Sequence, residues 1–275
     1  MAAGSRWAAD VAFAEEIARR AGELVHASYE RVQRIRHKSP RDVVTEVDYA
    51  SEKLLIDAIR AEHPDDAILA EESGHHRRGR RGSVAPRTWV LDPLDGTVNY
   101  ANGIPFFCVS VALVGPDGPL AGVVLDPMRN DCYAATADGP ATLNGVRVTP
   151  PDKPQLSDYV VSLAVIGRGG LGHERRIARE IRIHRRMGSA ALSLAYVANG
   201  RFDAFVQNGG LSPWDVAAAG LVAQRSGALM TNLTGESWWD ATPRARLSVI
   251  SAPPAQHARL LELVQASGTR VRERR

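Results

Sequence analysis

The stretch TWVLDPLDGT, residues 88–97, ends an apolar run with two aspartates that stand three positions apart. The apolar part predicts a buried strand, and Asp92 and Asp95 follow it directly. A strand that ends in acids carries them to the rim of its sheet, where α/β proteins bind their ligands. Gly96 then allows the backbone to approach a ligand closely. On its own such a stretch is most often a turn, so its meaning depends on other segments.

Two further element boundaries carry acids. The segment AILAEES (67–73) predicts a strand followed by Glu71 and Glu72, and PWDVAAA (213–219) predicts a helix with Asp215 in its first turn. Gathering such carboxylates costs free energy through repulsion, which a hard divalent cation removes. Magnesium prefers oxygen ligands, and no histidine or cysteine cluster competes for a softer metal. Two such ions can hold both the attacking and the leaving oxygen of a phosphoryl transfer.

The composition indicates an ordinary soluble protein. The chain has 275 residues, 44% of them hydrophobic, a formal net charge of +3 and two cysteines outside any metal-binding motif. The N-terminal segment carries acids within its apolar pattern, and no apolar run is long enough to cross a membrane. Arginine clusters such as HHRRGRRG (75–82) lack a recognisable nucleic-acid motif. We therefore expect a cytoplasmic protein without a membrane or nucleic-acid partner.

The order of elements predicts a mixed α+β or α/β fold. Hydrophobic periodicity and turn signals favour two helices and then a strand-rich stretch, at 8–32, 47–62, 67–73, 87–92, 106–114, 119–127, 131–136 and a hairpin at 143–148. The second half alternates strands and helices, at 158–165, 173–183, 189–200, 201–206, 213–227, 228–233, 246–252 and 254–267. Proline-dense residues 149–157 suggest a boundary between lobes 1–150 and 151–275, which form one compact catalytic unit.

These motifs together resemble the inositol monophosphatase family, whose members are magnesium-dependent, lithium-sensitive phosphatases. The matching segments cover most of the chain in the family's order, and they are KSPRDVVTEVD (38–48), AEES (70–73), TWVLDPLDGTVNYANGIPFFCVSVAL (88–113), MGSAALSLAYVANGRFDAF (187–205) and PWDVAAAGLVAQRSGA (213–228). The resemblance implies a layered αβαβα sandwich, and commonly a homodimer.

The resemblance also implies a role for each matching residue. The metal ligands would be Glu71, Asp92 and the main-chain carbonyl of Leu94 for one Mg²⁺, and Asp92, Asp95 and Asp215 for a second. The catalytic residues would be Thr97, which with Asp48 orients and helps to deprotonate the attacking water, and Glu72, near a further metal position. The substrate contacts would be the backbone of Gly96 and Thr97, the segment Gly188, Ser189 and Ala190, and Lys38 in a loop that covers the site.

One position departs from the family pattern. In VQNGGLSPWD (206–215), Asn208 replaces a glutamate that in inositol phosphatases bonds to the inositol hydroxyls. An amide both donates and accepts, so Asn208 is still expected to contact the substrate. Arginines near the site, namely Arg168 and either Arg185 or Arg186, would favour a second anionic group on the substrate.

The expected activity is that of a Mg²⁺-dependent phosphomonoesterase acting on a small phosphorylated polyol, with inositol 1-phosphate as the first candidate. Fructose 1,6-bisphosphate, histidinol phosphate and 3′-phosphoadenosine 5′-phosphate stay open, because substrate choice lies in variable loops. A second class is a non-catalytic regulatory homologue. It is disfavoured because every implied acid is present, namely Glu71, Asp92, Asp95, Asp215 and Asp48.

Overall fold

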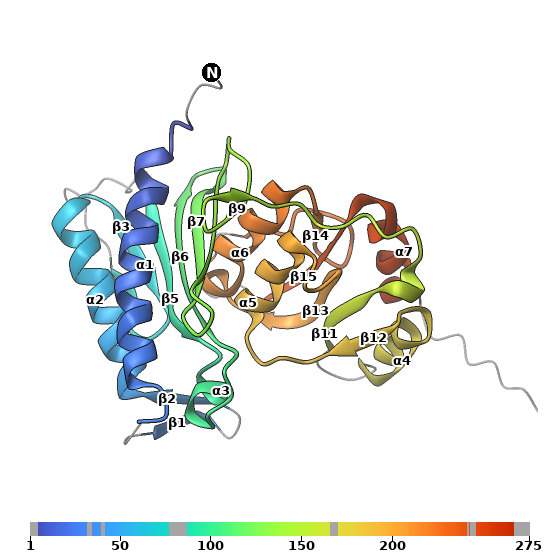
Figure 1. Cartoon of the computed structure of the whole chain (residues 1–275), viewed down its shortest axis with the longest axis horizontal. Coiled ribbons are helices and arrows are strands. Elements are labelled where there is room, and N and C mark those ends of the chain that lie inside the picture. Colours follow the sequence, from blue (N-terminus) through green and yellow to red (C-terminus); the bar gives the residue numbers. More distant parts are fainter. Residues whose placement is uncertain are drawn as a thin grey trace, which may run out of the picture.

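The computed structural model describes residues 5–31, 35–39, 42–76, 87–165, 170–240, 242 and 246–266, with only the backbone at 37–39, 42, 165 and 170–173. Helices and sheets alternate in layers across the molecule (Figure 1). Helices α1 (Ala8–Ser28) and α2 (Glu46–Glu62) cover one face of the larger sheet, and α5 (Ala190–Ala195) and α6 (Pro213–Ser226) lie between the two sheets. Helices α4 (Gly170–Glu180) and α7 (Pro254–Gln265) cover the outer face of the smaller sheet. The predicted αβαβα sandwich is confirmed.

The larger sheet has eight strands in the order β10-β9-β8-β7-β6-β5-β3-β4. They are β3 (Ala67–Ala70), β4 (Gly74–His76), β5 (Thr88–Asp95), β6 (Cys108–Gly115), β7 (Gly118–Asp126), β8 (Asp131–Thr136), β9 (Thr142–Leu143) and β10 (Val146–Arg147). Only the β3–β5 pair is parallel among these described strands. Every residue of β6 is buried, because helices cover both faces of the sheet there.

The smaller sheet has five strands in the order β12-β11-β13-β15-β14. They are β11 (Val160–Val165), β12 (Ile183–Arg185), β13 (Ala204–Leu211), β14 (Leu229–Thr231) and β15 (Leu247–Ala252). Strand β11 lies parallel to both β12 and β13, and β15 lies antiparallel to its neighbours. The short strands β1 (Ile35–Ser39) and β2 (Asp42–Thr45) form a separate antiparallel pair.

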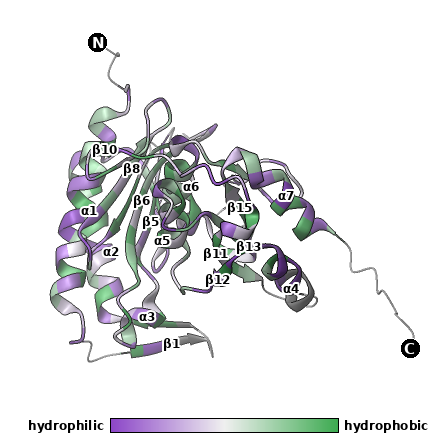
Figure 2. Cartoon of the chain, turned by 45° about the vertical axis from the view of Figure 1, so that its right-hand side comes forward, coloured by the Kyte–Doolittle hydropathy of each residue, from purple (hydrophilic) through white to green (hydrophobic). Residues whose placement is uncertain are grey.

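The helices follow from their hydrophobic patterns. Helix α1 buries residues at spacings of three and four, including Ala14, Ile17, Ala21 and Val25, and hydrophilic and hydrophobic residues alternate along it in Figure 2. Helix α6 is buried on nearly all sides, as expected for a helix packed between two sheets. Helix α5 continues into a 3₁₀ turn that ends at Gly200 in the left-handed conformation, the predicted end of this helical segment.

Three apolar clusters form the core, one around the central helices and one under each outer pair of helices. The cluster between the two sheets joins residues from both predicted lobes, for example Val90 and Val124 with Phe205 and Val216. The second cluster lies under α1 and α2, and the third lies between the smaller sheet and α4 and α7. The lobe boundary at 149–157 stays a prediction. The central apolar cluster contains residues from both sides of it.

Two strands run further than the sequence predicted. Strand β5 was expected to end at Asp92 and continues to Asp95, and β13 was expected to end at residue 206 and continues to Leu211.

The Asn-Gly hairpin is confirmed: Asn144 and Gly145 both have positive φ between β9 and β10. Among the described residues, no helix combines the length and hydropathy that a membrane-spanning segment requires.

Candidate active site

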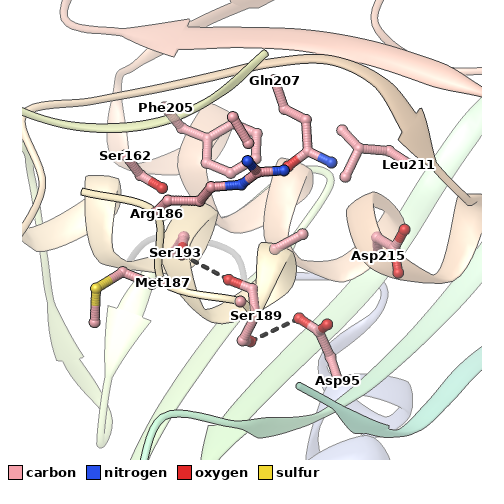
Figure 3. Close-up of a pocket in the computed structure, with 13 residues that line it drawn as sticks. Asp95, Ser162, Arg186, Met187, Ser189, Ser193, Phe205, Gln207, Leu211 and Asp215 are labelled. Carbon is pink, nitrogen blue, oxygen red and sulfur yellow. Dashed lines mark hydrogen bonds between the residues drawn. The ribbon is translucent and has the colours of Figure 1, made fainter. Parts of the chain in front are cut away.

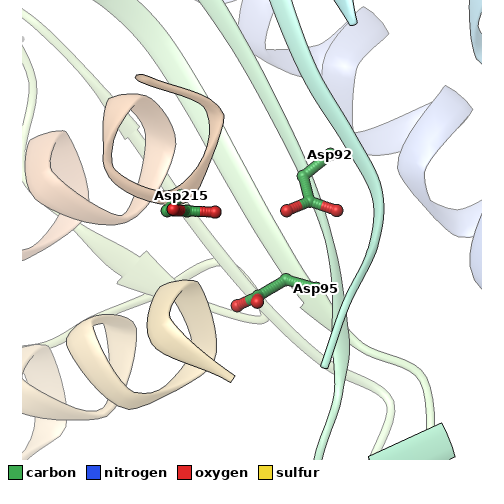
Figure 4. A group of neighbouring side chains, drawn as sticks. All are labelled: Asp92, Asp95 and Asp215. Atoms are coloured by element: carbon green, nitrogen blue, oxygen red, sulfur yellow. The ribbon is translucent and has the colours of Figure 1, made fainter. Parts of the chain in front are cut away.

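Three aspartates form a cluster between the larger sheet and the central helices. Each of Asp92, Asp95 and Asp215 offers a carboxylate oxygen, and these oxygens all lie within 4.8 Å of one another. Asp92 and Asp95 project from β5, whereas Asp215 comes from the first turn of α6 (Figure 4). The structure thus brings the DPLD stretch and the distant PWD motif together.

An irregularity in β5 brings its two aspartates to the same side. Residues three apart in a regular strand face opposite sides of the sheet. The pairing of β5 with β6 shifts register between Asp92 and Asp95, as in a β-bulge. The Asp92 carboxylate accepts a hydrogen bond from the Leu94 amide at 3.1 Å, which stabilises this irregular segment. The bulge therefore creates the carboxylate pair.

Asp95 is held by the start of α5. Its Oδ2 accepts a hydrogen bond from the Ser189 hydroxyl at 2.7 Å (Figure 3). The same oxygen accepts a second hydrogen bond from the Ala191 amide at 2.6 Å. Ser189 also caps α5, because its hydroxyl accepts from the Leu192 amide. The helix start thus stabilises the Asp95 carboxylate and leaves it a second oxygen that can coordinate a cation.

Asp215 has a comparable anchor. It is the third residue of α6, and its Oδ2 accepts a hydrogen bond from the amide of the N-cap residue Ser212 at 2.6 Å. Pro213 occupies the first position of the helix, where a missing N–H costs nothing. Asp215 therefore completes a capping box while its carboxylate faces the cluster.

Glu71 lies next to Asp92 because β3 and β5 are parallel. Ala70 pairs with Leu91, and the Glu71 amide donates to the Leu91 carbonyl at 3.2 Å. The negative charge of Glu71 is one cause of the raised pKa of Asp92. Glu72 is half-buried in the turn that follows β3. The predicted meeting of the two strand ends is therefore seen.

The electrostatics of the cluster favour a cation. Burial and then the charges of neighbouring acids raise the pKa of Asp92 well above its usual range, and burial and Asp95 do the same for Asp215. Burial raises the pKa of Asp95 to about 6, against the hydrogen bond from Ser189. A bound cation would relieve this repulsion, and a set of carboxylate oxygens suits a hard divalent ion. The cluster is thus compatible with metal binding.

Thr97 and Asp48 form a buried hydrogen-bonded pair beside the cluster. The Thr97 hydroxyl lies 3.0 Å from Asp48 Oδ1 and 3.0 Å from the Leu94 carbonyl oxygen. Asp48 also accepts from the Thr45 amide at 2.9 Å and from its hydroxyl at 2.6 Å. Thr97 begins the short helix α3 (Thr97–Ala101), whose N-cap Gly96 has φ of +100°. The predicted Thr97–Asp48 pair is present.

A cavity of about 210 Å³ opens beside Asp95 and Asp215. The predicted segment Gly188, Ser189 and Ala190 lines it, together with Arg186, Gln207 and Ser162. In Figure 3 the side chains of Arg186 and Gln207 lie across the cavity from Asp95. The cavity therefore has the carboxylates of Asp95 and Asp215 on one side, and the Arg186 guanidinium and the Gln207 amide on the other.

Two of the predicted contacts do not line this cavity. Asn208 is not among the residues that line this cavity, whereas its neighbour Gln207 is, because successive side chains of a strand face opposite sides. Arg185 does not line it either, and its guanidinium donates to the His184 carbonyl. Lys38 belongs to β1, but its side chain is outside the described residues, as are Arg168 and residues 77–82 of the arginine-rich loop.

Sequence reasoning missed several polar groups at the site. Cys108 is fully buried, with its sulfur 3.7 Å from the Ser189 hydroxyl, and burial raises the pKa of its thiol. Ser51 and Glu52 on α2 bond to the segments that carry the acids. They stand three and four residues after Asp48, a spacing that places all three side chains on one side of a helix. The sequence therefore contained a signal that Ser51 and Glu52 face the site.

Known proteins resemble this chain over most of its length. The sequence model of the "Inositol monophosphatase family" matches residues 7–269. "Nus factor SuhB" of Pseudomonas aeruginosa is 38% identical over 228 residues, which cover 79% of this chain and 83% of that relative. "Inositol monophosphatase 2" of Solanum lycopersicum is 34% identical over 236 residues, or 83% and 89% of the two chains.

Solved structures show the same fold. The extragenic suppressor protein suhB from Bartonella henselae superposes with a TM-score of 0.86 at 29% identity, covering 94% of this chain and all (100%) of that one. The Thermotoga maritima IMPase TM1415 superposes with a TM-score of 0.82 at 30% identity, covering 93% and 96%. The motifs, the layered fold and these matches agree, and the chain belongs to the inositol monophosphatase family.

Proposed function

We propose that this protein is a Mg²⁺-dependent phosphomonoesterase that hydrolyses a small phosphorylated polyol, with inositol 1-phosphate as the first candidate substrate. The observation that carries the proposal is the cluster of Asp92, Asp95 and Asp215 beside a cavity of about 210 Å³. Such a cavity accommodates a small polar molecule. Burial and mutual repulsion raise the pKa of each of its three acids, and a bound divalent cation would offset that repulsion.

The proposed ligands divide between metal positions. Glu71, Asp92 and the Leu94 carbonyl would hold one Mg²⁺, Asp92 with Asp95 and Asp215 a second, and Glu72 lies near a further position. When bound, such ions supply a nucleophilic water at neutral pH and stabilise charge on the phosphoryl and leaving oxygens. The Leu94 carbonyl oxygen lies 3.0 Å from the Thr97 hydroxyl, and its two lone pairs allow it to serve as a metal ligand there.

The proposed catalytic pair is Thr97 with Asp48. The Thr97 hydroxyl donates to Asp48 Oδ1 at 3.0 Å, so its oxygen can accept a hydrogen bond from the attacking water. This arrangement orients the water and gives its proton a path through Thr97 to Asp48. Because Asp48 is 0% exposed and Thr97 9% exposed, bulk water does not compete for these hydrogen bonds.

The remaining residues would bind the substrate. The backbone N–H groups of Gly96 and Thr97, where α3 begins, are proposed to hold the phosphate. The leaving group would occupy the cavity against Gly188, Ser189 and Ala190, within reach of Gln207 and Arg186. The loop with Lys38 would cover the site, and Asn208 remains a proposed contact from the neighbouring position of β13.

The competing class is a non-catalytic regulatory homologue. It deserves a test because several relatives are named Nus factor SuhB, which is the name of a factor and not of an enzyme. The intact acidic cluster favours catalysis in this chain. The proposed protein is a homodimer whose subunits each have two lobes. It is proposed to act in the cytoplasm and to bind no nucleic acid.

The test is phosphate release from a panel of small phosphate esters, with Mg²⁺ and with EDTA. The panel contains inositol 1-phosphate, fructose 1,6-bisphosphate, histidinol phosphate and 3′-phosphoadenosine 5′-phosphate. We expect Mg²⁺-dependent release that is fastest for the inositol ester. A folded protein that releases phosphate from no member would refute the enzymatic assignment and favour the regulatory class.

A matched pair of variants separates chemistry from folding. Asp215→Asn should abolish release, because it removes a cluster charge. Asp203→Asn should retain it. Asp203 is also a buried aspartate that accepts a main-chain N–H, from Val160 at 2.7 Å, and it pairs with Lys153, but it lies just before β13 and outside the acidic cluster.

A further inference from the structure

We propose that one face of α2, formed by Asp48, Ser51 and Glu52, positions the segments that carry the acids before any cation binds. Ser51 and Glu52 are positioning residues in this arrangement, and neither is proposed to touch substrate or metal. The inference rests on the proposed function, because it takes the acidic cluster to be the metal site. We call these three residues the α2 polar face.

The α2 polar face is buried although its residues are polar. Asp48 and Ser51 are 0% exposed and Glu52 is 3% exposed. Residues three and four apart lie on one side of a helix, so all three side chains project in the same direction. Burying a carboxylate or a hydroxyl costs free energy unless hydrogen bonds replace those to water. The partners of these side chains therefore show what the face is built to hold.

Glu52 holds the turn that carries Glu71 and Glu72. Its Oε2 accepts from the Glu72 amide at 2.8 Å, and its Oε1 accepts from the Ser73 amide at 3.0 Å. Two bonds from one carboxylate to consecutive amides fix both the position and the orientation of the turn. Glu71, the residue just before these amides, is thereby held beside Asp92.

Ser51 holds the irregular part of β5. Its hydroxyl donates to the Pro93 carbonyl oxygen at 2.9 Å, in the stretch where pairing with β6 shifts register between Asp92 and Asp95. A buried carbonyl in a bulge needs a donor from outside the ladder. Ser51 supplies that donor, and so fixes the peptide between the two aspartates.

Asp48 completes the set through Thr97, at the start of α3. A single rigid helix thus contacts the turn after β3, the bulge in β5 and the beginning of α3. The charges of Asp92, Asp95 and Glu71 repel one another and push these segments apart. The α2 polar face opposes that movement, which keeps the ligand oxygens near their binding geometry in the absence of metal.

The alternative is that these hydrogen bonds only satisfy buried polar groups. The two ideas differ in what a variant changes. A purely structural bond lowers stability alone, whereas a positioning bond also weakens metal binding, because the cation must then reassemble its ligands. Metal affinity is therefore the decisive measurement, and it requires no catalytic activity.

The experiment compares Ser51→Ala and Glu52→Gln with a matched control, Ser226→Ala. Ser226 is 4% exposed, and its hydroxyl donates to the Ala223 carbonyl at 2.7 Å, at the far end of α6 from Asp215. Binding of Mn²⁺ is followed by the paramagnetic resonance signal of the free ion, and the melting temperature is measured without metal.

We expect Ser51→Ala to weaken Mn²⁺ binding about 5-fold, the value for one lost hydrogen bond. We expect Glu52→Gln to weaken it about 10- to 100-fold, as for other residues that support metal ligands. The control Ser226→Ala should lower the melting temperature to a similar extent as Ser51→Ala and leave Mn²⁺ affinity within about 2-fold of the wild type.

Unchanged Mn²⁺ affinity in both α2 variants, with a lowered melting temperature, would overturn the positioning role and leave the proposed function standing. A wild-type protein that binds no Mn²⁺ would overturn the metal site and this inference together. If Glu52→Gln does not fold, Ser51→Ala decides alone, since it removes one oxygen and leaves the helix otherwise unchanged.

Discussion

Replacing Gly96 by alanine tests how tightly the site is built. Gly96 lies between Asp95 and Thr97 with φ of +100°, a conformation that L-residues rarely adopt. An added Cβ would lie 3.0 Å from the Phe106 carbonyl oxygen and 3.2 Å from the Phe107 Cα. Both are backbone atoms of the segment that leads into β6. The alanine must therefore push this segment and the start of α3 apart.

The size of the effect follows from two contributions. A left-handed conformation costs an alanine about 1–2 kcal/mol, offset by about 0.5–1 kcal/mol from the stiffer unfolded chain. Overpacking against backbone adds about 1–3 kcal/mol. Gly227→Ala isolates the first contribution, because Gly227 has φ of +108° and nothing within 4 Å of the added Cβ. We expect losses of about 3 kcal/mol for Gly96→Ala and about 1 kcal/mol for Gly227→Ala.

Thermal unfolding in EDTA and Mg²⁺-dependent phosphate release are the assays. For a chain of this size about 1 kcal/mol corresponds to roughly 2–4 °C, so we expect Gly96→Ala to melt about 6–12 °C lower and Gly227→Ala about 2–4 °C lower. Only Gly96→Ala should also slow turnover, by about 10-fold or more, because displaced catalytic groups lose alignment. Equal melting temperatures for the two variants and normal turnover would refute this account of the turn.

Other variants test the remaining features. Asp92→Asn should abolish phosphate release, yet melt at a higher temperature than the wild type in EDTA, because it removes a repelling buried charge; a lower melting temperature would contradict the electrostatic account. Burial lowers the pKa of His257 from its ordinary 6.5, so folding favours the neutral ring and stability is lost as pH falls below that value. Between pH 7 and pH 5 the free energy of unfolding, measured by denaturant titration, should therefore fall less steeply for His257→Gln than for the wild type. Parallel stability curves for the two proteins would argue against this role of His257. Gln207→Ala should raise KM more than Asn208→Ala, because Gln207 lines the cavity and Asn208 does not; the reverse order in steady-state kinetics would make Asn208 the main contact and contradict this placement.

The sequence predicted those parts of the fold that depend on local pattern. Apolar periodicity located α1, α2 and α6 to within a few residues, since each has a continuous buried side. The rule that strand ends carry ligands brought Glu71 and Asp92 together correctly, because it needs only the parallel pairing of two neighbouring strands. The match to a family then supplied the layer order.

The parts that were missed depend on contacts between distant segments. The end of β5 could not be placed because a proline normally argues against a strand, and only pairing with β6 carries the strand past it to Asp95. Similarly, β13 continues to Leu211 through Gly209 and Gly210, both with positive φ, because it pairs with β15. That extension decides which of two adjacent amides, Gln207 or Asn208, faces the cavity.

Helix α2 shows why a polar residue at a buried position carries information. Its C-terminal half buries Leu55, Ile56 and Ile59, as the hydrophobic pattern predicts. Its N-terminal half buries Ser51 and Glu52 on the same side, although such polar residues are usually in solvent. The helix therefore packs into the core at one end and faces a polar site at the other. Buried polar groups are costly unless they are paired. The change from apolar to polar buried residues along α2 therefore indicates where the site lies, independently of the aspartates themselves.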